Sequence, residues 1–206
     1  MTPTIDGSAH LDAAVGRAAT CLLAGGVVVL PTDTVYGLAA NAVYPGAMMR
    51  LFAMKERPDG VPVAVLVSDI DQADRIGRFS AADRAVADAF WPGPLTLVVE
   101  ARSKTIEHGL ATVDGTIGIR CPEELLVRRL AEIVGPLATS SANRHGAPTP
   151  VAAPDAASTL AGVPDLVIDG GPRSGDPSTV VTIGPPLVVH RAGALSEASL
   201  RAAVPS

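Results

Sequence analysis

Polar side chains that could bind a ligand follow directly after an apolar segment near the start of the chain. Residues 27–30 are Val-Val-Val-Leu, which predicts a short buried strand, and Pro31, which cannot donate to a sheet ladder, ends it. The next six residues are Thr-Asp-Thr-Val-Tyr-Gly. In open α/β sheets, ligands bind beside the carboxyl ends of strands, so these hydroxyls and the carboxylate are candidates for ligand contacts. The alternative is a strand-to-helix turn in which threonine and aspartate only cap the next helix.

Cationic side chains also stand at the ends of predicted elements. Lys55 and Arg57 close a predicted helix, while Arg120 and Arg191 each end an apolar segment that is predicted to be a strand. Singly, each position is explained by a surface cap or by a cation near a helix C-terminus. Jointly they predict one crevice that binds an anionic small molecule, because arginine pairs well with carboxylate and phosphate groups.

Neutral hydrogen-bonding groups complete this set. Ser141 and Asn143 open a hydroxyl-rich turn, and Ser178 with Thr179 follows a loop rich in glycine and proline. An N-cap followed by an Asx-turn explains the first pair equally well. Beside the cations, these groups would add donors and acceptors to the same predicted crevice.

The hydrophobic pattern predicts the elements that position these residues. Helices are predicted over 11–24, 46–55, 81–90, 123–134, 151–160 and 196–204. Strands are predicted over 27–30, 63–67, 95–100, 116–120, 137–139, 166–168, 178–183 and 187–191, the last two paired. The polar segment 101–115 is predicted to be irregular and exposed. This alternation favours one α/β or α+β domain on a twisted, mixed sheet.

Composition and absent motifs exclude several classes of protein. The chain has 206 residues, 48% of them hydrophobic but only 3% aromatic, and a formal net charge of −5. This acidic balance argues against loose binding to nucleic acid, and few aromatic side chains are available for base stacking. There is no P-loop, no G-x-G-x-x-G, no H-E-x-x-H and no G-x-S-x-G motif. The scattered histidines and cysteines lack metal-ligand spacing, so no metal ligand is assignable.

The sequence also predicts where the protein works. The first ten residues lack the apolar core of a signal peptide, and no apolar run reaches the roughly 18 residues that span a bilayer. Two thiols without an export signal fit a reducing compartment. We therefore expect a cytoplasmic protein without membrane contact.

Eight short motifs occur in a fixed order along the chain. They are 31–38 (P-T-D-T-V-Y-G-L), 55–58 (K-E-R-P), 91–96 (W-P-G-P-L-T), 117–122 (I-G-I-R-C-P), 140–143 (S-S-A-N) with Gly146 and Pro148, 169–171 (D-G-G), 178–181 (S-T-V-V) and 191–193 (R-A-G). On these motifs the chain resembles the YrdC-domain family, the threonylcarbamoyl-adenylate synthases of transfer-RNA modification. Three positions depart from the family pattern: Asn41 where an acidic residue is common, Cys121 where valine is common, and Thr182 where aspartate is frequent.

The resemblance implies a fold and a reaction. The fold would be an α/β (α+β) YrdC-like domain over residues 1–206 with a core at about 11–194, a twisted mixed sheet, flanking helices and a large concave groove. The chain is similar to the short form that lacks the additional C-terminal domain of longer relatives. The activity would be a nucleotidyltransferase that makes L-threonylcarbamoyladenylate and pyrophosphate from L-threonine, bicarbonate or carbon dioxide, and ATP, with Mg²⁺ assisting.

The resemblance also implies a role for each matching residue. Lys55 and Arg57 would be catalytic and hold the phosphates and the carbamate. L-threonine would be bound by Thr34, Arg120 and Ser178, with Arg120 on its carboxylate. ATP would be bound by Arg57, Thr116, Thr139, Ser141, Asn143, Thr149 and Arg191. A downstream partner would transfer the threonylcarbamoyl group to transfer RNA, and direct binding of transfer RNA would be weak or absent.

Two other functions fit the same residues. One is a module that binds a nucleotide or RNA in the groove without turnover. The other is a carbamoyl-transfer domain of the hydrogenase-maturation type, which shares the fold but belongs to much larger chains.

Overall fold

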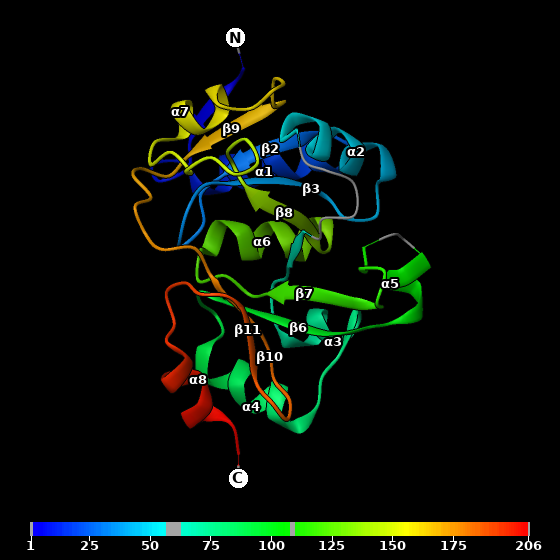
Figure 1. The fold of residues 1–206 in the computed structure, drawn as a ribbon. Coiled ribbons are helices and arrows are strands. Elements are labelled where there is room, and N and C mark those ends of the chain that lie inside the picture. Colours follow the sequence, from blue (N-terminus) through cyan, green and yellow to red (C-terminus); the bar gives the residue numbers. More distant parts are fainter. Residues whose placement is uncertain (1, 57–62, 108–109, 206) are drawn as a thin grey trace.

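The computed structural model describes residues 2–56, 63–107 and 110–205, and its strands form one mixed sheet (Figure 1). The strands are β1 (Thr4–Asp6), β2 (Val27–Leu30), β3 (Gly37–Asn41), β4 (Ala64–Leu66), β5 (Gly77–Arg78), β6 (Leu95–Ala101), β7 (Thr116–Arg120), β8 (Leu137–Ser141), β9 (Leu166–Asp169), β10 (Thr179–Thr182) and β11 (Val188–Arg191). The helices are α1 (Leu11–Leu23), α2 (Pro45–Met54), α3 (Ile70–Asp74), α4 (Ala81–Phe90), α5 (Ser103–Glu107), α6 (Leu125–Val134), α7 (Ala153–Ser158) and α8 (Glu197–Ala203).

The strands of the sheet follow the order β1-β9-β2-β3-β8-β4-β7-β6-β10-β11, and β5 pairs with the C-terminal end of β6. Four pairs are parallel (β1 with β9, β2 with β9, β4 with β7, β6 with β10), and the other pairs are antiparallel. Figure 1 shows β9, β2, β3 and β8 in the upper half of the molecule and β7, β6, β10 and β11 in the lower half. The predicted α/β (α+β) fold with a twisted mixed sheet is confirmed.

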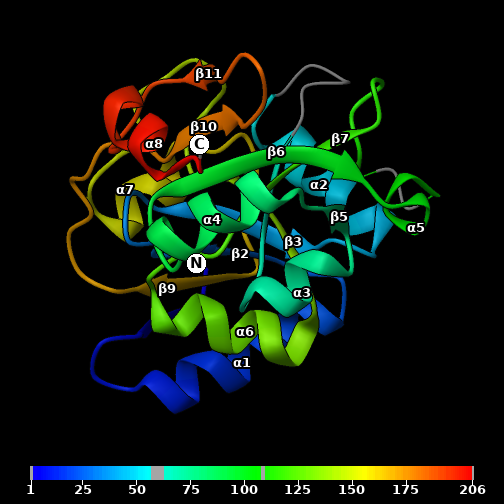
Figure 2. The same cartoon turned by 90° about the horizontal axis from the view of Figure 1, so that it is seen from below.

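Strand β2 lies at the centre of the upper half because both of its faces are apolar. Its four side chains are fully buried, and they alternate between two hydrophobic clusters. Val27 and Val29 face the larger cluster, which includes α2, and Val28 with Leu30 faces the cluster formed with α1 and α6. Figure 2 shows α1 and α6 side by side on that face. The strand ends before Pro31, as predicted.

The turn that follows β2 leads into another strand rather than into a helix. Residues 31–36 connect β2 to β3, and the two strands pair antiparallel, with Leu30 opposite Gly37. The alternative of a helix-capping turn is therefore wrong. Strand β3, with the sequence Gly-Leu-Ala-Ala-Asn, lacks the β-branched residues that mark strands in a sequence, and it is buried between β2 and β8.

The segment 101–115 differs from the prediction. It was expected to be irregular and exposed, but it contains α5, and Ala101, Thr105 and Leu110 are buried. Thr105 Oγ1 donates to the carbonyl of Ile76 at 2.8 Å, and Arg102 Nε donates to the carbonyl of Asp74 at 2.5 Å. Polar side chains here bind the backbone of the preceding segment, which a hydrophobic pattern does not reveal.

None of the helices described here is long and apolar enough to cross a membrane. Helices α4 and α8 lie side by side against the lower half of the sheet (Figures 1 and 2). Helix α4 begins with a capping box in which Ser80 and Asp83 satisfy each other's backbone amides.

A glycine near the end of the sheet supplies a testable stability prediction. A Cβ on Gly193 would lie 2.1 Å from the carbonyl oxygen of Pro177, whereas a Cβ on exposed Gly184 would have no atom closer than 3.8 Å. Gly193→Ala must therefore displace backbone, and we expect it to lower the free energy of unfolding by roughly 1–3 kcal/mol in urea denaturation. Gly184→Ala is the matched control, with an expected change within about 0.5 kcal/mol. Equal effects would contradict the close approach.

Candidate active site

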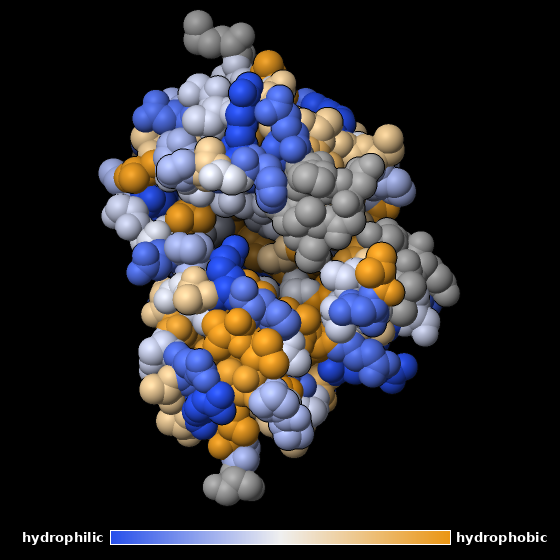
Figure 3. All heavy atoms as spheres, viewed as in Figure 1, coloured by the Kyte–Doolittle hydropathy of each residue, from blue (hydrophilic) through white to orange (hydrophobic). Residues whose placement is uncertain are grey.

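A cavity of about 910 Å³ opens between the two halves of the sheet. Figure 3 shows a hollow on this face of the molecule at the middle of its height. Its volume is at the upper end of the range for small-molecule sites, which leaves room for more than one substrate. The predicted residues on its walls are Thr34, Thr116, Arg120, Thr139, Ser141, Asn143, Thr149, Ser178 and Arg191.

The regular alternation of the strands places these side chains on one face of the sheet. Thr116 and Arg120 lie on β7 at even spacing, and Thr139 and Ser141 do so on β8. Between the first two, Gly118 has no side chain, and a Cβ there would meet Thr96 Cγ2 at 3.3 Å. The sheet therefore forms a floor with polar groups at its ends and an open centre.

The guanidinium of Arg120 is the most enclosed charge on the cavity wall, since the residue is only 5% exposed. Its Nη2 donates to Asp33 Oδ1 at 2.6 Å, its Nη1 to Thr34 Oγ1 at 3.0 Å and its Nε to the Gly93 carbonyl at 3.1 Å. Burial lowers the pKa of Arg120, and the charge of Asp33 acts against that shift. The arginine is thus held by two other segments of the chain, the turn after β2 and Gly93.

A second arginine, Arg191 at the end of β11, binds the start of β10. Its Nε and Nη2 donate to the Ser178 carbonyl at 3.1 and 2.8 Å, and Nη2 also donates to Ser178 Oγ at 2.9 Å. Ser178 Oγ and Thr96 Oγ1 are 2.8 Å apart and hydrogen-bonded. Partial burial, and then the positive charge of Arg120, lower the pKa of Arg191. The positive charge of Arg120 thus acts on Arg191, and both arginines line the cavity.

This end of the cavity has an unbalanced charge that suits an anion. Two guanidinium groups, on Arg120 and Arg191, face the single carboxylate of Asp33 in the part of the chain described. The hydroxyls of Thr34, Thr96 and Ser178 lie beside them. A ligand that carries an anionic group next to a short polar side chain would find both cations and neutral donors at this end of the cavity.

The turn between β2 and β3 positions Asp33 and Thr34. Thr32 Oγ1 accepts hydrogen bonds from the amides of Thr34 and Val35, both at 3.2 Å, and donates to the carbonyl of Val35 at 2.6 Å. The carbonyl of Thr34 accepts the amide of Gly175 at 3.2 Å. Thr32 therefore stabilises the backbone of the turn, while Thr34 faces the cavity and Asp33 binds Arg120.

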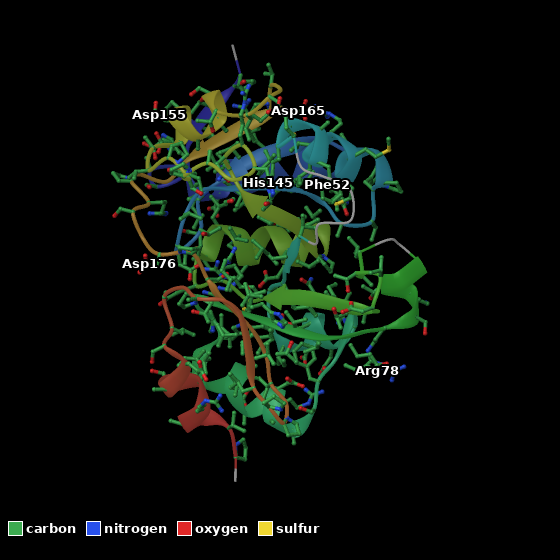
Figure 4. The ribbon with its side chains drawn as sticks, viewed as in Figure 1. Phe52, Arg78, His145, Asp155, Asp165 and Asp176 are labelled. Carbon is green, nitrogen blue, oxygen red and sulfur yellow. The ribbon has the colours of Figure 1, made fainter. Side chains whose placement is uncertain are left out.

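The segment from 170 to 178, between β9 and β10, closes one side of this end. Tyr36 Oη donates to the carbonyl of Gly171 at 2.7 Å and accepts the amide of Gly170 at 3.0 Å. Arg173 Nη2 pairs with Glu124 Oε2 at 2.8 Å. Figure 4 labels Asp176 on this segment, where it runs down the side of the molecule from the upper half to the lower.

Another part of the cavity wall is formed by the turn after β8, the strand whose last residue, Ser141, pairs with Gly37. Asn143 Oδ1 accepts from Ser141 Oγ at 2.5 Å, and Asn143 Nδ2 donates to the carbonyl of Ala147. The amide of His145 donates to the carbonyl of Lys55 at 3.0 Å, and Figure 4 shows His145 close to helix α2. The turn is thus fixed both internally and to the end of α2.

Lys55 is buried, with 1% of its surface exposed, and is not part of the cavity wall described here. Its Nζ donates to the carbonyls of Ser141 and Asn143 at 2.5 and 2.7 Å and to Asn143 Oδ1 at 2.9 Å. The structure therefore brings Lys55 to Ser141 and Asn143, as a charge beneath their turn. Arg57, the other residue predicted to be catalytic, lies outside the described residues.

Thr116 belongs to a small polar cluster on the cavity wall. Its Oγ1 donates to Asp114 Oδ1 at 2.9 Å and is hydrogen-bonded to Thr112 Oγ1 at 2.8 Å. Hydrogen bonds from Thr112, and then from Thr116, lower the pKa of Asp114. Thr139 is buried and donates to the carbonyl of Leu137 at 3.2 Å, while Thr149 is half-buried.

The described residues do not form a protein site for Mg²⁺. No group of three or more His, Cys, Asp or Glu residues among them could hold a metal ion. Of the nearby carboxylates, Asp33 is paired with Arg120, and Asp114 binds two threonine hydroxyls.

Two residues that contribute to the candidate site, Asp33 and Thr96, were not assigned a role from the sequence. Asp33 was noted as the one carboxylate in the turn, and its place between two threonines at a strand end was the available signal. Thr96, the last residue of the 91–96 motif, was not singled out, and only the pairing of β6 with β10 brings it to Ser178.

Comparison with known proteins gives three likenesses. The family model Sua5/YciO/YrdC, described as telomere recombination, matches residues 20–193. The threonylcarbamoyl-AMP synthase of Bacillus subtilis is 33% identical over 197 residues, which cover 94% of this chain and 57% of that protein. The crystal structure of Pyrococcus abyssi Sua5 complexed with L-threonine has a TM-score of 0.83 at 33% identity, covering 92% of this chain and 56% of that one. The chain thus spans little more than half the length of these two relatives.

A second solved structure has nearly the length of this chain. Escherichia coli YciO has a TM-score of 0.82 at 24% identity and covers 95% of this chain and 96% of its own. At this identity the likeness concerns the fold alone.

Cys121, the residue after Arg120, allows a prediction of how the stability of the protein depends on pH. Cys121 Sγ donates to the carbonyl of Ser68 at 3.3 Å, and burial raises the pKa of the Cys121 thiol to about 11. Below its unfolded-state pKa of about 8.5 the thiol is protonated in both states, so its contribution to stability is complete. Above that pH the unfolded chain loses the proton first, and by pH 11 the free energy of unfolding should fall by up to about 3 kcal/mol.

Cys121→Ser keeps a hydrogen-bond donor but has no thiol to ionise. Urea unfolding at pH 8, 9 and 10.5 should give a steeper loss of stability for the wild type than for Cys121→Ser. Parallel pH profiles would mean that the Cys121 thiol ionises as easily in the folded protein as in the unfolded chain.

Proposed function

Because the chain belongs to the Sua5/YciO/YrdC family, we propose that it is a threonylcarbamoyl-AMP synthase. It would join L-threonine, bicarbonate or carbon dioxide, and ATP into L-threonylcarbamoyladenylate and pyrophosphate, for the threonylcarbamoyladenosine modification of transfer RNA. The observation that carries the proposal is the cationic end of the cavity, where Arg120 is held beside Thr34 and Ser178. A relative at 33% identity, solved with L-threonine, supports it.

L-threonine would bind at this end through its two polar functions. Arg120 is suited to the α-carboxylate because its guanidinium is charged, planar and fixed. The hydroxyls of Thr34 and Ser178 would lie next to the rest of the amino acid. The open floor at Gly118 leaves space between this end and the turn after β8.

ATP would occupy the remaining length of the cavity. Its proposed ligands are Arg57, Thr116, Thr139, Ser141, Asn143, Thr149 and Arg191. Arg191, which binds Ser178 beside the proposed threonine site, would neutralise phosphate charge close to the amino acid. Because the described carboxylates do not form a metal site, Mg²⁺ would arrive on the phosphates of ATP rather than on protein ligands.

The reaction needs positioning and charge stabilisation rather than a protein nucleophile. The amine of threonine forms a carbamate with carbon dioxide, and a carbamate oxygen attacks the α-phosphorus, releasing pyrophosphate. The developing negative charge would be stabilised by the arginines and by Lys55, whose ammonium lies beneath Ser141 and Asn143. We assign Lys55 and Arg57 to this catalytic role.

The product would pass to a partner that transfers the threonylcarbamoyl group to adenosine. With a formal net charge of −5, the protein itself is expected to bind bare transfer RNA weakly. Tight RNA binding without turnover would instead favour the binding module. Turnover of carbamoyl phosphate without threonine would favour the carbamoyl-transfer domain of the hydrogenase-maturation type.

The proposal predicts a strict requirement for three substrates. The purified protein should release pyrophosphate from ATP only when L-threonine and bicarbonate are both present, as measured by a coupled pyrophosphate assay. Each substrate is omitted in turn as the control. Pyrophosphate release that does not depend on threonine, or no release by folded protein, would reject the synthase.

The catalytic role of Lys55 can be tested against the other lysine of the chain. Lys55→Met keeps the apolar stem but removes the buried charge, and we expect kcat/KM to fall by about 10²–10³-fold. Lys104→Met, at an exposed position on α5, is the matched control and should stay within about twofold. Circular dichroism and melting temperature establish that both variants fold. Equal kinetics for two folded variants would reduce Lys55 to a structural cation.

A further inference from the structure

We propose that Asp33 is a positioning residue for recognition of the substrate carboxylate. Its own carboxylate holds the guanidinium of Arg120 in an orientation that leaves two N–H groups for the amino acid. This inference rests on the proposed function, because it takes an α-amino acid as the ligand at this end of the cavity.

The protein partners of Arg120 use only some of the N–H groups of its guanidinium. An arginine side chain carries five N–H donors and no acceptor. Gly93 occupies the donor on Nε, Thr34 one donor on Nη1 and Asp33 one donor on Nη2. Within residues 2–56, 63–107 and 110–205, one hydrogen on each terminal nitrogen therefore has no protein acceptor. Each of these two N–H groups can donate to an oxygen of a carboxylate that enters the cavity.

Asp33 is the only charged partner of Arg120 among the described residues. The other two partners, a backbone carbonyl and a threonine hydroxyl, are neutral. The nearby charge of Arg191 is repulsive. Without Asp33, a guanidinium that is 5% exposed would face a second cation and only neutral acceptors, so it would turn toward solvent in the cavity.

The backbone around Asp33 is held firmly enough to give this contact a fixed geometry. Thr32 Oγ1 binds the amides of the two residues after Asp33, and Gly175 binds the carbonyl of Thr34. A Cβ on Gly175 would lie 3.0 Å from that same carbonyl oxygen, so the two segments are in close contact. Asp33 is thus fixed from both sides of the turn and can in turn fix Arg120.

A purely structural counter-ion would also sit 2.6 Å from Arg120. Both roles predict a loss of stability when the charge of Asp33 is removed. Only the positioning role predicts a loss of discrimination between a carboxylate and a carboxamide, because discrimination depends on where the two remaining N–H groups point. The experiment therefore measures discrimination and stability separately.

Isothermal titration calorimetry with the full chain, in the absence of ATP, gives the affinity for L-threonine and for L-threoninamide. The wild type should bind threonine at least about tenfold more tightly than threoninamide, since the amide lacks the charge that Arg120 recognises. Asp33→Asn should weaken threonine binding by at least about tenfold and bring the ratio close to one.

Asp33→Glu guards against a variant that simply fails to fold. It keeps the negative charge and displaces the guanidinium by the length of one methylene, so the melting temperature should stay near that of the wild type while the ratio still falls. Asp74→Asn is the matched control: it makes the same change in the Asp74–Arg84 ion pair, which measures 2.8 Å and lies outside the cavity wall. It should lower stability without changing either affinity.

The outcomes separate the inference from the proposed function. Wild-type protein that binds no threonine overturns both. Wild-type protein that binds and discriminates, with an unchanged ratio in folded Asp33→Asn or Asp33→Glu, overturns the positioning role alone and leaves the synthase proposal standing.

Discussion

The buried guanidinium of Arg120 is the constraint on which the candidate site depends. A charge that is 5% exposed has lost most of its hydration, and removing one partner from such a pair typically costs about 3–5 kcal/mol. Arg120 therefore requires Asp33, Thr34 and Gly93 at fixed positions. Because Gly93 lies 27 residues and Asp33 lies 87 residues before Arg120 in the chain, the arginine ties the turn after β2 to the lower half of the sheet.

The same arrangement explains how a cavity lined mostly by uncharged side chains can attract anions. Asp33 balances one arginine, and Arg191 remains as a second cation in contact with Ser178. Lys55 is a further cation, held by Ser141 and Asn143 beneath the turn after β8. The cavity lining itself carries Arg120 and Arg191 among many neutral side chains. The overall charge of −5 does not reveal this local balance.

Long, strongly patterned elements could be predicted from the sequence. Strand β2, strand β7 and helix α4 have the predicted bounds, because apolar runs and capping residues mark them locally. The YrdC-domain family was identified from motifs and is confirmed by the match over residues 20–193. Strand β3 was missed and segment 101–115 was wrong, since the first is a strand only through its neighbours and the second is buried by polar side chains that bind backbone.

The sequence by itself determined which residue types stand at the strand ends and the order in which they occur. Together with the resemblance to the YrdC-domain family, this predicted that Thr34, Arg120 and Ser178 belong together, although 144 positions separate the first from the last. Only the tertiary structure decided how they meet. Strand pairing brings Thr96 to Ser178, the β2–β3 turn directs Asp33 toward Arg120, and burial turns Lys55 beneath Ser141 rather than onto the cavity wall. The physical reason is that hydrogen-bond direction and loss of hydration depend on three-dimensional neighbours, which the spacing of residues along a chain does not specify.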